Sequence, residues 1–178
     1  MSWLSAERTE VGADRILNAA AELFVERGIG RPGMEEVARA AGCSRATVYR
    51  YFDSKDALLK AFVHREALDI TEHVAEQISM SDADDSNAVV EAVVATLAAI
   101  RARPHLRPWY AESDTTVLFD VLRSSPLVAR LAEDFLRHEK GEPDADLGRW
   151  VVRIVMSFLR EPEADQDEER RLLERFLV

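Results

Sequence analysis

The sequence predicts an all-α fold: an N-terminal three-helix domain with a helix-turn-helix, joined by a long helix to a helical C-terminal domain. Apolar residues recur at helical spacing through most of the 178 residues. No run of alternating β-branched residues indicates a strand. With 7 glycines and 6 prolines, the chain is not dominated by loops. We expect about nine helices.

The N-terminal half is expected to hold four helices before a polar linker. Ile16, Ala20 and Phe24 share one face of the first helix, which should end near Gly28. Ser54 is placed to cap the last and longest helix. The four expected helices lie at residues 16–28, 34–41, 44–52 and 54–78, and the acidic linker SMSDADDSN covers residues 79–87.

The C-terminal half is less regular in pattern. Pro104 should end one helix, and Gly141 and Pro143 should separate two others. The acidic run from Glu161 to Glu169 is interpreted as a solvated connection. Helices are expected over residues 87–103, 115–123, 127–139, 144–160 and 166–178. We divide the chain into two domains, residues 8–60 and residues 61–178.

The net charge of −10 is unevenly distributed. Residues 1–64 are neutral overall, so the whole excess of acidic residues falls on 65–178. Residues 38–52 contain Arg39, Arg45 and Arg50 and no acidic residue. This local basic patch permits nucleic-acid binding despite the acidic mean. The single cysteine, Cys43, excludes an internal disulfide framework.

Residues 34–52 have the pattern of a helix-turn-helix. Gly42 suits the left-handed backbone of a tight turn between two helices, and Ser44 can cap the second helix. Val48 and Phe52 share the inward face of that helix, while Ala46 and Arg50 project outward. An outward face of this kind suits the major groove of DNA.

Several spaced segments resemble the TetR family of bacterial transcriptional regulators. They are ILNAAAELFVERG (16–28), EEVARAAGCSRATVYRYFDSKDALL (35–59) and the pattern Tyr49-x-Tyr51-Phe52-x-x-Lys55-x-x-Leu58. The resemblance covers about the first 60 residues and implies a cytoplasmic, homodimeric repressor. Its partners would be a palindromic double-stranded DNA operator and a small-molecule effector, without a cofactor or a membrane.

The resemblance also implies roles for individual residues. The recognition helix corresponds to residues 44–52, with Arg45, Ala46, Thr47 and Tyr49 facing the bases and Ser44 as cap. Tyr49, Tyr51 and Lys55 match phosphate-contacting positions, and we add Arg50 as a phosphate or base contact because of its outward position. Where the family commonly opens the second helix with Thr or Ser, this chain has Pro32-Gly33. Phosphate is therefore expected at the amides of Gly33 and Met34.

The helix at 144–160 carries apolar residues around most of its circumference, which predicts burial on two sides. With the helix at 166–178 it is expected to form a four-helix dimer seam, in line with the family. Two ordinary core helices remain the alternative. The expected interface residues are Leu147, Trp150, Val151, Ile154, Val155, Phe158, Leu172, Leu173 and Phe176.

An effector pocket is expected around the proline-interrupted segment that follows residue 104. The candidate lining residues are His105, Trp109, Tyr110, Leu118, Phe119 and Leu122. The acidic second domain favours a neutral or cationic apolar ligand. Ordinary core packing is the alternative for each aromatic residue.

No catalytic or metal site is predicted. His64 and His73 lie nine residues apart, on opposite faces of one helix, and the chain has no Gly-rich phosphate loop. Cys43 is interpreted as a packing residue in the turn, with a redox role as the alternative. Two other functional classes stay open, a helical protein-interaction module and a small all-α enzyme.

Overall fold

The computed structural model describes residues 3–79, 88–111, 120–122, 125–128, 130–131 and 145–177. All regular structure in these segments is helical, as predicted. Residues 80–87 of the expected linker and most of the helices expected over 115–123 and 127–139 lie outside the described residues, as do Leu118, Phe119 and the side chain of Leu147. In the part that is described, no helix is long and apolar enough to span a membrane.

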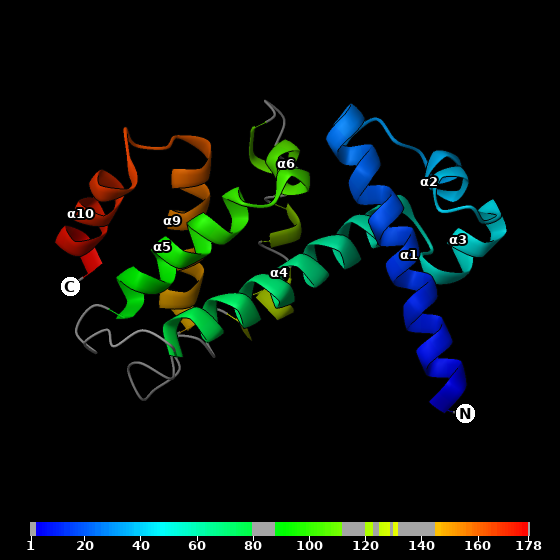
Figure 1. The fold of residues 1–178 in the computed structure, drawn as a ribbon, viewed down its shortest axis with the longest axis horizontal. Helices are drawn as coiled ribbons and strands as arrows, with labels where there is room; N and C mark the ends of the chain where they lie inside the picture. Colours follow the sequence, from blue (N-terminus) through cyan, green and yellow to red (C-terminus); the bar gives the residue numbers. More distant parts are fainter. Residues whose placement is uncertain are drawn as a thin grey trace.

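The N-terminal helices gather at one end of the molecule (Figure 1). They are α1 (Trp3–Arg27), α2 (Met34–Ala40) and α3 (Arg45–Tyr51), followed by α4 (Lys55–Ser79). The helix expected over 16–28 already begins at Trp3, because no proline interrupts residues 3–15 and Gly12 is tolerated within a helix. With 25 residues, α4 is about 37 Å long and runs from this end into the other half of the chain.

Of the remaining described helices, α5 (Ala88–Arg101) packs along α4. The others are the short 3₁₀ helix η2 (Pro104–Leu106), α6 (Arg107–Ala111), α9 (Ala145–Arg160) and α10 (Gln166–Leu177), of which the last three pack mainly on α5 or α9. Pro104 opens η2, as its missing N–H allows. α5 lies between α4 and α9, and α10 lies against α5 (Figure 1).

Three aromatic rings join the two ends of the molecule. Phe62 of α4 stacks on Trp109 of α6, with ring centroids 5.2 Å apart. Phe24 of α1 meets both rings edge to face, at 5.4 and 5.6 Å. All three side chains are buried. Each such pair contributes about 0.5–1.5 kcal/mol beyond area burial, so the cluster fixes α1 against the second half of the chain.

An ion pair between a buried glutamate and a partly exposed arginine holds α10 in place. Both guanidinium nitrogens of Arg101 on α5 donate to Glu169 on α10, at 2.6 and 2.7 Å, and one also donates to the carbonyl of Phe158. Glu169 is only 2% exposed, and its hydrogen bonds raise the pKa of Arg101. The interpretation of residues 161–169 as a solvated connection is therefore wrong at its end. Glu169 belongs to α10 and turns inward, where it pairs with Arg101.

Replacing Arg101 by Met should lower the free energy of unfolding by about 3 kcal/mol or more, because the Glu169 carboxylate would remain buried without its partner. Urea unfolding at a fixed protein concentration measures this loss. Arg149→Met is the matched control, since Arg149 pairs with Asp146 on the exposed surface of α9 and should cost less than about 1 kcal/mol. Equal losses in the two variants would contradict a structural role for the Arg101–Glu169 pair.

Candidate functional site

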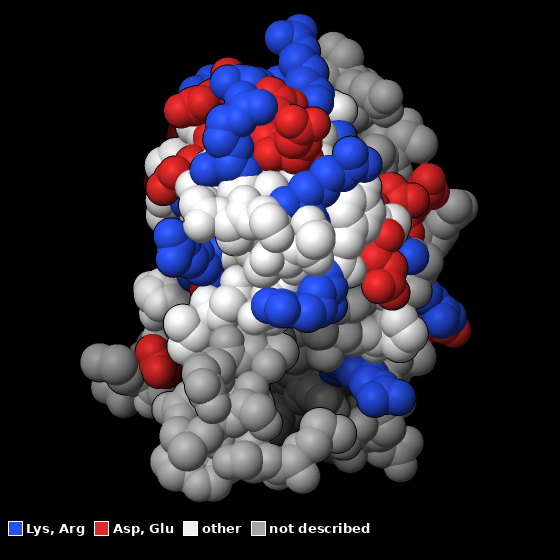
Figure 2. Space-filling view, turned by 90° about the vertical axis from the view of Figure 1, so that its right-hand side faces the viewer, with Lys and Arg blue, Asp and Glu red and all other residues white. Residues whose placement is uncertain are grey.

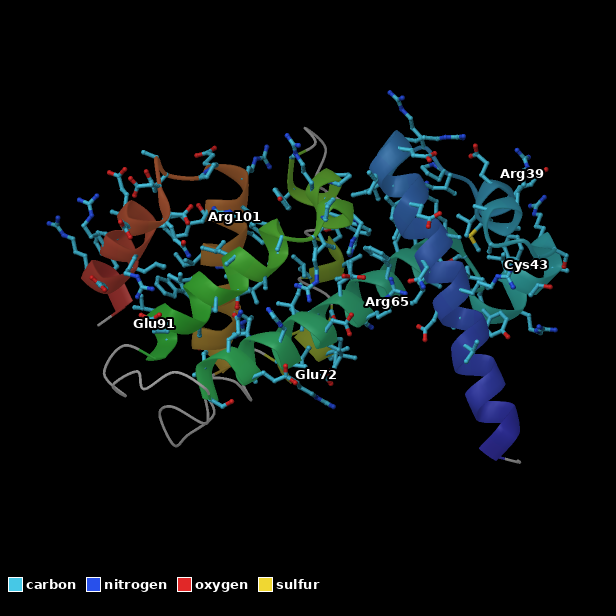
Figure 3. All side chains as sticks on the ribbon, viewed as in Figure 1. Arg39, Cys43, Arg65, Glu72, Glu91 and Arg101 are labelled. Carbon is cyan, nitrogen blue, oxygen red and sulfur yellow. The ribbon has the colours of Figure 1, made fainter. Side chains whose placement is uncertain are left out.

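The turn between α2 and α3 has the geometry that the sequence predicts. Gly42 adopts φ +64°, the left-handed region that favours glycine. The N–H of Cys43 then donates to the carbonyl of Ala38, and the Ser44 hydroxyl accepts from the N–H of Thr47 at 3.0 Å. Cys43 itself packs half-buried against the core, near Arg39 at the outer end of the molecule (Figure 3). The turn therefore holds α3 at a fixed angle to α2.

One face of α3 is buried and the other is free. Val48 is fully buried, and Phe52, which follows the helix, is 7% exposed. The outward residues are exposed or half-buried, and they are Ser44, Arg45, Ala46, Thr47, Tyr49 and Arg50. Tyr49 is 38% exposed, although it is a large apolar ring. An exposed helix face with arginine, threonine and tyrosine side chains can enter a major groove.

Two arginines of this face rest on aromatic rings. The Arg45 guanidinium lies 5.3 Å from the centroid of Tyr49, and a hydrogen bond with the Tyr49 side chain raises the pKa of Arg45. Arg50 lies at the same distance over Tyr51. Tyr51 is half-buried against α1, where a Cβ added at Gly12 would overlap its ring. The stacking partly orders the two guanidinium groups before any partner binds.

The candidate phosphate contacts already have partners within the chain. The N–H of Gly33 donates to the Glu36 carboxylate at 3.0 Å, which lowers the pKa of Glu36. Lys55 Nζ donates to the carbonyl of Gly30 at 2.7 Å. This arrangement places Lys55 beside the start of α2, whose first N–H groups are those of Gly33 and Met34. A phosphate at this position would exchange these internal hydrogen bonds for its own.

Figure 2 shows the face of the molecule that carries α2 and α3. Lysine and arginine side chains surround a largely uncharged centre, and acidic side chains lie mainly near the top and one margin. The distribution agrees with a local basic patch on a chain of net charge −10. Such a patch is the electrostatic footprint of a nucleic-acid-binding surface.

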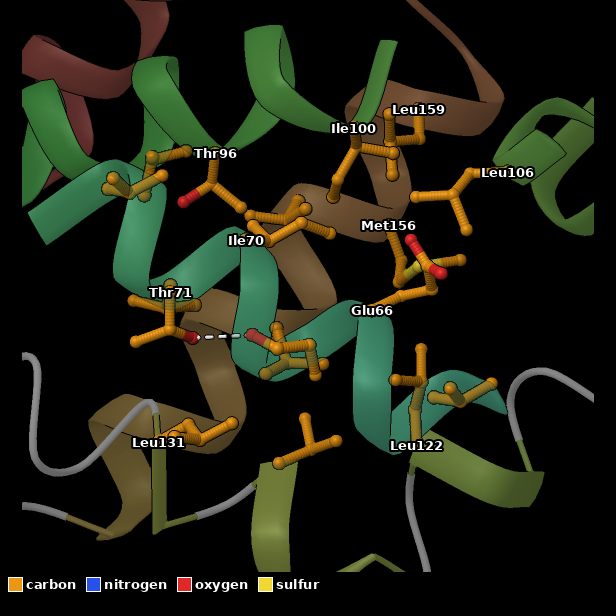
Figure 4. Close-up of a pocket in the computed structure, with 18 of the residues that line it drawn as sticks. Glu66, Ile70, Thr71, Thr96, Ile100, Leu106, Leu122, Leu131, Met156 and Leu159 are labelled. Carbon is orange, nitrogen blue, oxygen red and sulfur yellow. Dashed lines mark hydrogen bonds between the residues drawn. The ribbon is translucent and has the colours of Figure 1, made fainter. Parts of the chain in front are cut away.

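The second half of the chain forms a half-open apolar cavity of about 200 Å³ (Figure 4). Its walls come from α4, α5, η2, α6 and α9 together with Leu122, Val128 and Leu131. Of the residues expected to line a pocket, Trp109, Tyr110 and Leu122 do so. His105 is not in the wall but lies directly behind it. Most of the lining was not foreseen and comes from α4, α5 and α9, including Val63, Ile70, Val93, Ile100, Val155 and Met156.

Glu66 is the polar centre of this wall. It is 6% exposed and extends from α4 toward Leu106 and Met156 (Figure 4). His105 Nε2 shares a hydrogen bond with one carboxylate oxygen at 2.8 Å, and Arg65 donates to the other at 3.1 Å. The sequence pattern could have identified Glu66 as a buried residue, since it stands three residues after Val63 and four before Ile70, within the apolar stripe of α4.

Arg65 connects this carboxylate to the N-terminal end. One of its guanidinium nitrogens donates to Asn18 of α1 at 2.8 Å, while the other holds Glu66. The guanidinium also lies 5.6 Å from the centroid of Phe62. The cavity wall is therefore joined to α1 by a continuous path of polar contacts.

The candidate dimer residues fall into two groups. Trp150 and Phe176 are exposed, at 37% and 71%, and the half-buried Ile154, Phe158 and Leu172 accompany them. Val155 and Leu173 are buried within the chain itself, and Val151 and Val155 line the cavity. α9 thus has one apolar side toward the cavity and a second toward the surface, as its sequence pattern predicts.

Comparisons with known proteins agree with this architecture. The profile described as bacterial regulatory proteins, tetR family, matches residues 16–62. The uncharacterized HTH-type transcriptional regulator Rv1255c of Mycobacterium tuberculosis is 40% identical over 183 residues, covering 99% of this chain and 88% of that protein.

Solved structures share the fold at lower identity. A TetR transcriptional regulator from Rhodococcus sp. RHA1 has a TM-score of 0.66 at 24% identity, over 97% of this chain and 98% of that one. FadR of Bacillus subtilis, solved in complex with stearoyl-CoA, has a TM-score of 0.64 at 16% identity, over 92% and 96%.

The fold and the exposed face of α3 define a helix-turn-helix transcriptional regulator of the DNA-binding type, and not an enzyme. The chain belongs to the TetR family of bacterial transcriptional regulators.

Replacing Gly42 by Ala should lower the free energy of unfolding by about 1–2 kcal/mol, because a side chain at φ +64° is strained. Thermal or urea unfolding measures the loss. Gly30→Ala is the control, since no atom lies within 4 Å of an added Cβ there. A stable Gly42→Ala protein would show that the turn can relax without strain.

Proposed function

We propose that the protein is a homodimeric repressor that binds a two-fold symmetric operator and leaves it when a small molecule occupies the cavity. The exposed, capped face of α3 on a locally basic surface is the observation that carries the DNA half of this proposal. Arg45, Ala46, Thr47 and Tyr49 would contact base edges. Because its target is bacterial DNA, the proposal places the protein in the cytoplasm.

In this proposal a second set of residues fixes the orientation of α3 on the duplex. Lys55, Tyr51, Arg50 and the Met34 N–H would contact phosphates, with Gly33 joining them when Glu36 turns away. Phosphate contacts position a protein without reading sequence, whereas base contacts discriminate between sequences.

Selection of bound duplexes from a random library, at about 0.15 M ionic strength, tests the proposal. An enriched two-fold motif with half-sites about 34–36 Å apart, or a multiple of this, is the expected result. An enriched motif without symmetry would contradict a dimeric reader. A folded protein that enriches no motif would contradict the proposed operator.

Lys55→Ala and Arg45→Ala should weaken operator binding in different ways. Loss of a phosphate contact at Lys55 should weaken binding to all sequences alike and reduce the salt slope by about one. Loss of Arg45 should relax the preference at particular base pairs, with a cost of about 1–3 kcal/mol. Titration of operator variants at several salt concentrations separates the two effects. Arg171→Ala, an exposed arginine of α10, is the control and should leave binding unchanged.

The dimer half of the proposal rests on the outer side of α9 and on α10. Trp150 and Phe176 are exposed, and Ile154 and Phe158 lie on the same surface as Trp150 by helical spacing. Large exposed apolar side chains that gather on one face indicate an interaction surface. A two-fold axis there would pair α9 and α10 with their copies in a four-helix seam.

Trp150→Glu should convert the dimer to a monomer, since the seam would then bury unpaired charges close to its axis. Sedimentation or light scattering at micromolar concentration measures the change. Val25→Glu is the matched control, because Val25 is also exposed, at 50%, but lies on α1. A Trp150→Glu protein that stays dimeric would place the interface elsewhere.

The cavity supports the effector half of the proposal. One of its walls is α4, the helix that begins just after α3. A change in the shape of the cavity can therefore displace the recognition helix through α4. Arg65 provides a direct connection, since it holds Glu66 in the wall and Asn18 of α1 together. The structural relative FadR, which was solved in complex with stearoyl-CoA, supports the idea that a protein of this fold can bind a small-molecule ligand.

Operator and effector must weaken each other's binding by the same factor if this coupling exists. The effector can shift the protein only by its difference in affinity for the two conformations. Filling the cavity would move α4 relative to α1 and change the distance between the two recognition helices of a dimer.

A further inference from the structure

The described residues of the cavity wall include a single charged side chain. Of the charged residue types, Glu66 alone lines it, and no lysine, arginine or histidine does. The other polar members are Thr71, Thr96, Trp109 and Tyr110. Thr71 already donates its hydroxyl hydrogen to the carbonyl of Ala67 at 2.7 Å. A ligand in the cavity would therefore meet mainly apolar side chains, one buried carboxylate and the buried indole N–H of Trp109, for which the described residues provide no hydrogen-bond partner.

The Glu66 carboxylate retains capacity to accept hydrogen bonds. A carboxylate has about four acceptor positions on its two oxygens. In the described part of the chain, Arg65 and His105 fill one on each oxygen. Neither Arg65 nor His105 lines the cavity, so they fix the position of the carboxylate without occupying the space of a ligand. The remaining acceptor positions are available to a ligand that donates a hydrogen bond.

We propose that Glu66 selects the ligand of this cavity: a small, mainly aliphatic molecule whose polar head donates a hydrogen bond, either an alcohol or a protonated amine. A carboxylate head is disfavoured, because it has no hydrogen to donate and meets the negative charge of Glu66, while the described residues of the wall include no lysine, arginine or histidine. This proposal deepens the effector role proposed above and rests on it. It agrees with the neutral or cationic ligand that the acidic second domain predicts.

The size of the cavity limits the ligand. An apolar cavity of about 150 Å³ takes up benzene, so a cavity of about 200 Å³ suits a ligand modestly larger than benzene. A medium-length alkyl chain with a single polar head has the appropriate size and shape for a wall made of α4, α5 and α9.

Calorimetric titration with four probes tests the choice of head group. The probes are n-octylamine, n-octanol, n-octanoate and the purely apolar toluene. The wild-type protein should bind the amine and the alcohol at least tenfold more tightly than the carboxylate. Tighter binding of octanoate than of octylamine would overturn the proposal while leaving a ligand-responsive regulator in place.

Glu66→Gln should weaken octylamine binding about tenfold or more, the effect of losing a hydrogen bond to a charged group. Toluene binding should stay unchanged and reports that the cavity is intact. Glu72→Gln is the matched control, since Glu72 is exposed on the same helix. Unchanged octylamine affinity in Glu66→Gln would overturn the role of Glu66.

The comparison of head groups on the wild-type protein does not depend on how well the variant folds. If none of the four probes binds, the cavity is not a ligand site, and the effector half of the proposed function fails with this inference. If octylamine binds through Glu66 but leaves operator affinity unchanged, the ligand class stands and only the proposed release is wrong.

Discussion

The packing of Phe24, Phe62 and Trp109 is the contact on which the arrangement of the molecule depends. These three rings come from α1, α4 and α6, and each is buried against the other two. Core aromatic residues are typically worth about 3–5 kcal/mol each when truncated. Because Phe24 lies in the N-terminal domain and Trp109 in the cavity wall, the cluster transmits the position of one domain to the other.

A buried carboxylate beside this cluster adds a second constraint. Glu66 is expensive to bury unless it is paired, and Arg65 and His105 provide the pairing. In the same position, Arg65 also donates to Asn18 of α1. The residues that stabilise the buried carboxylate are therefore the same ones that connect the cavity wall to α1.

The sequence predicts most of the described helices, the turn and the exposed face of α3, because these depend on local rules, but it places no helix over residues 104–111, where η2 and α6 lie. Gly42 and Ser44 show this most clearly, since a left-handed residue and a cap act within a few residues of chain. The two apolar sides of α9 follow from its spacing alone. Helix ends are less certain, and the start of α1 at Trp3 lies well before the apolar pattern becomes regular.

What could not be predicted depends on partners distant in sequence. Glu169 reads as part of a solvated acidic run until Arg101, 68 residues earlier, is seen to pair with it. The cavity wall has the same character. The sequence pattern predicts a pocket lined by residues after Pro104. Most of the wall belongs instead to helices whose apolar residues are equally consistent with a filled core. Whether a core leaves a space is decided by how all its side chains fit together.

The position of α9 connects the two proposed activities of the second domain. Its inner side, with Val151, Val155 and Met156, lines the cavity, while Trp150 and Phe158 belong to the proposed seam. Close-packed helices transmit displacements instead of absorbing them. A ligand that moves α9 would thus shift the proposed dimer axis, while its contact with α4 moves the recognition helix. If the two subunits pivot about one seam, small changes at each cavity change the distance between their recognition helices. This distance must match the half-site spacing of the operator, which is one helical turn of DNA or a multiple of it.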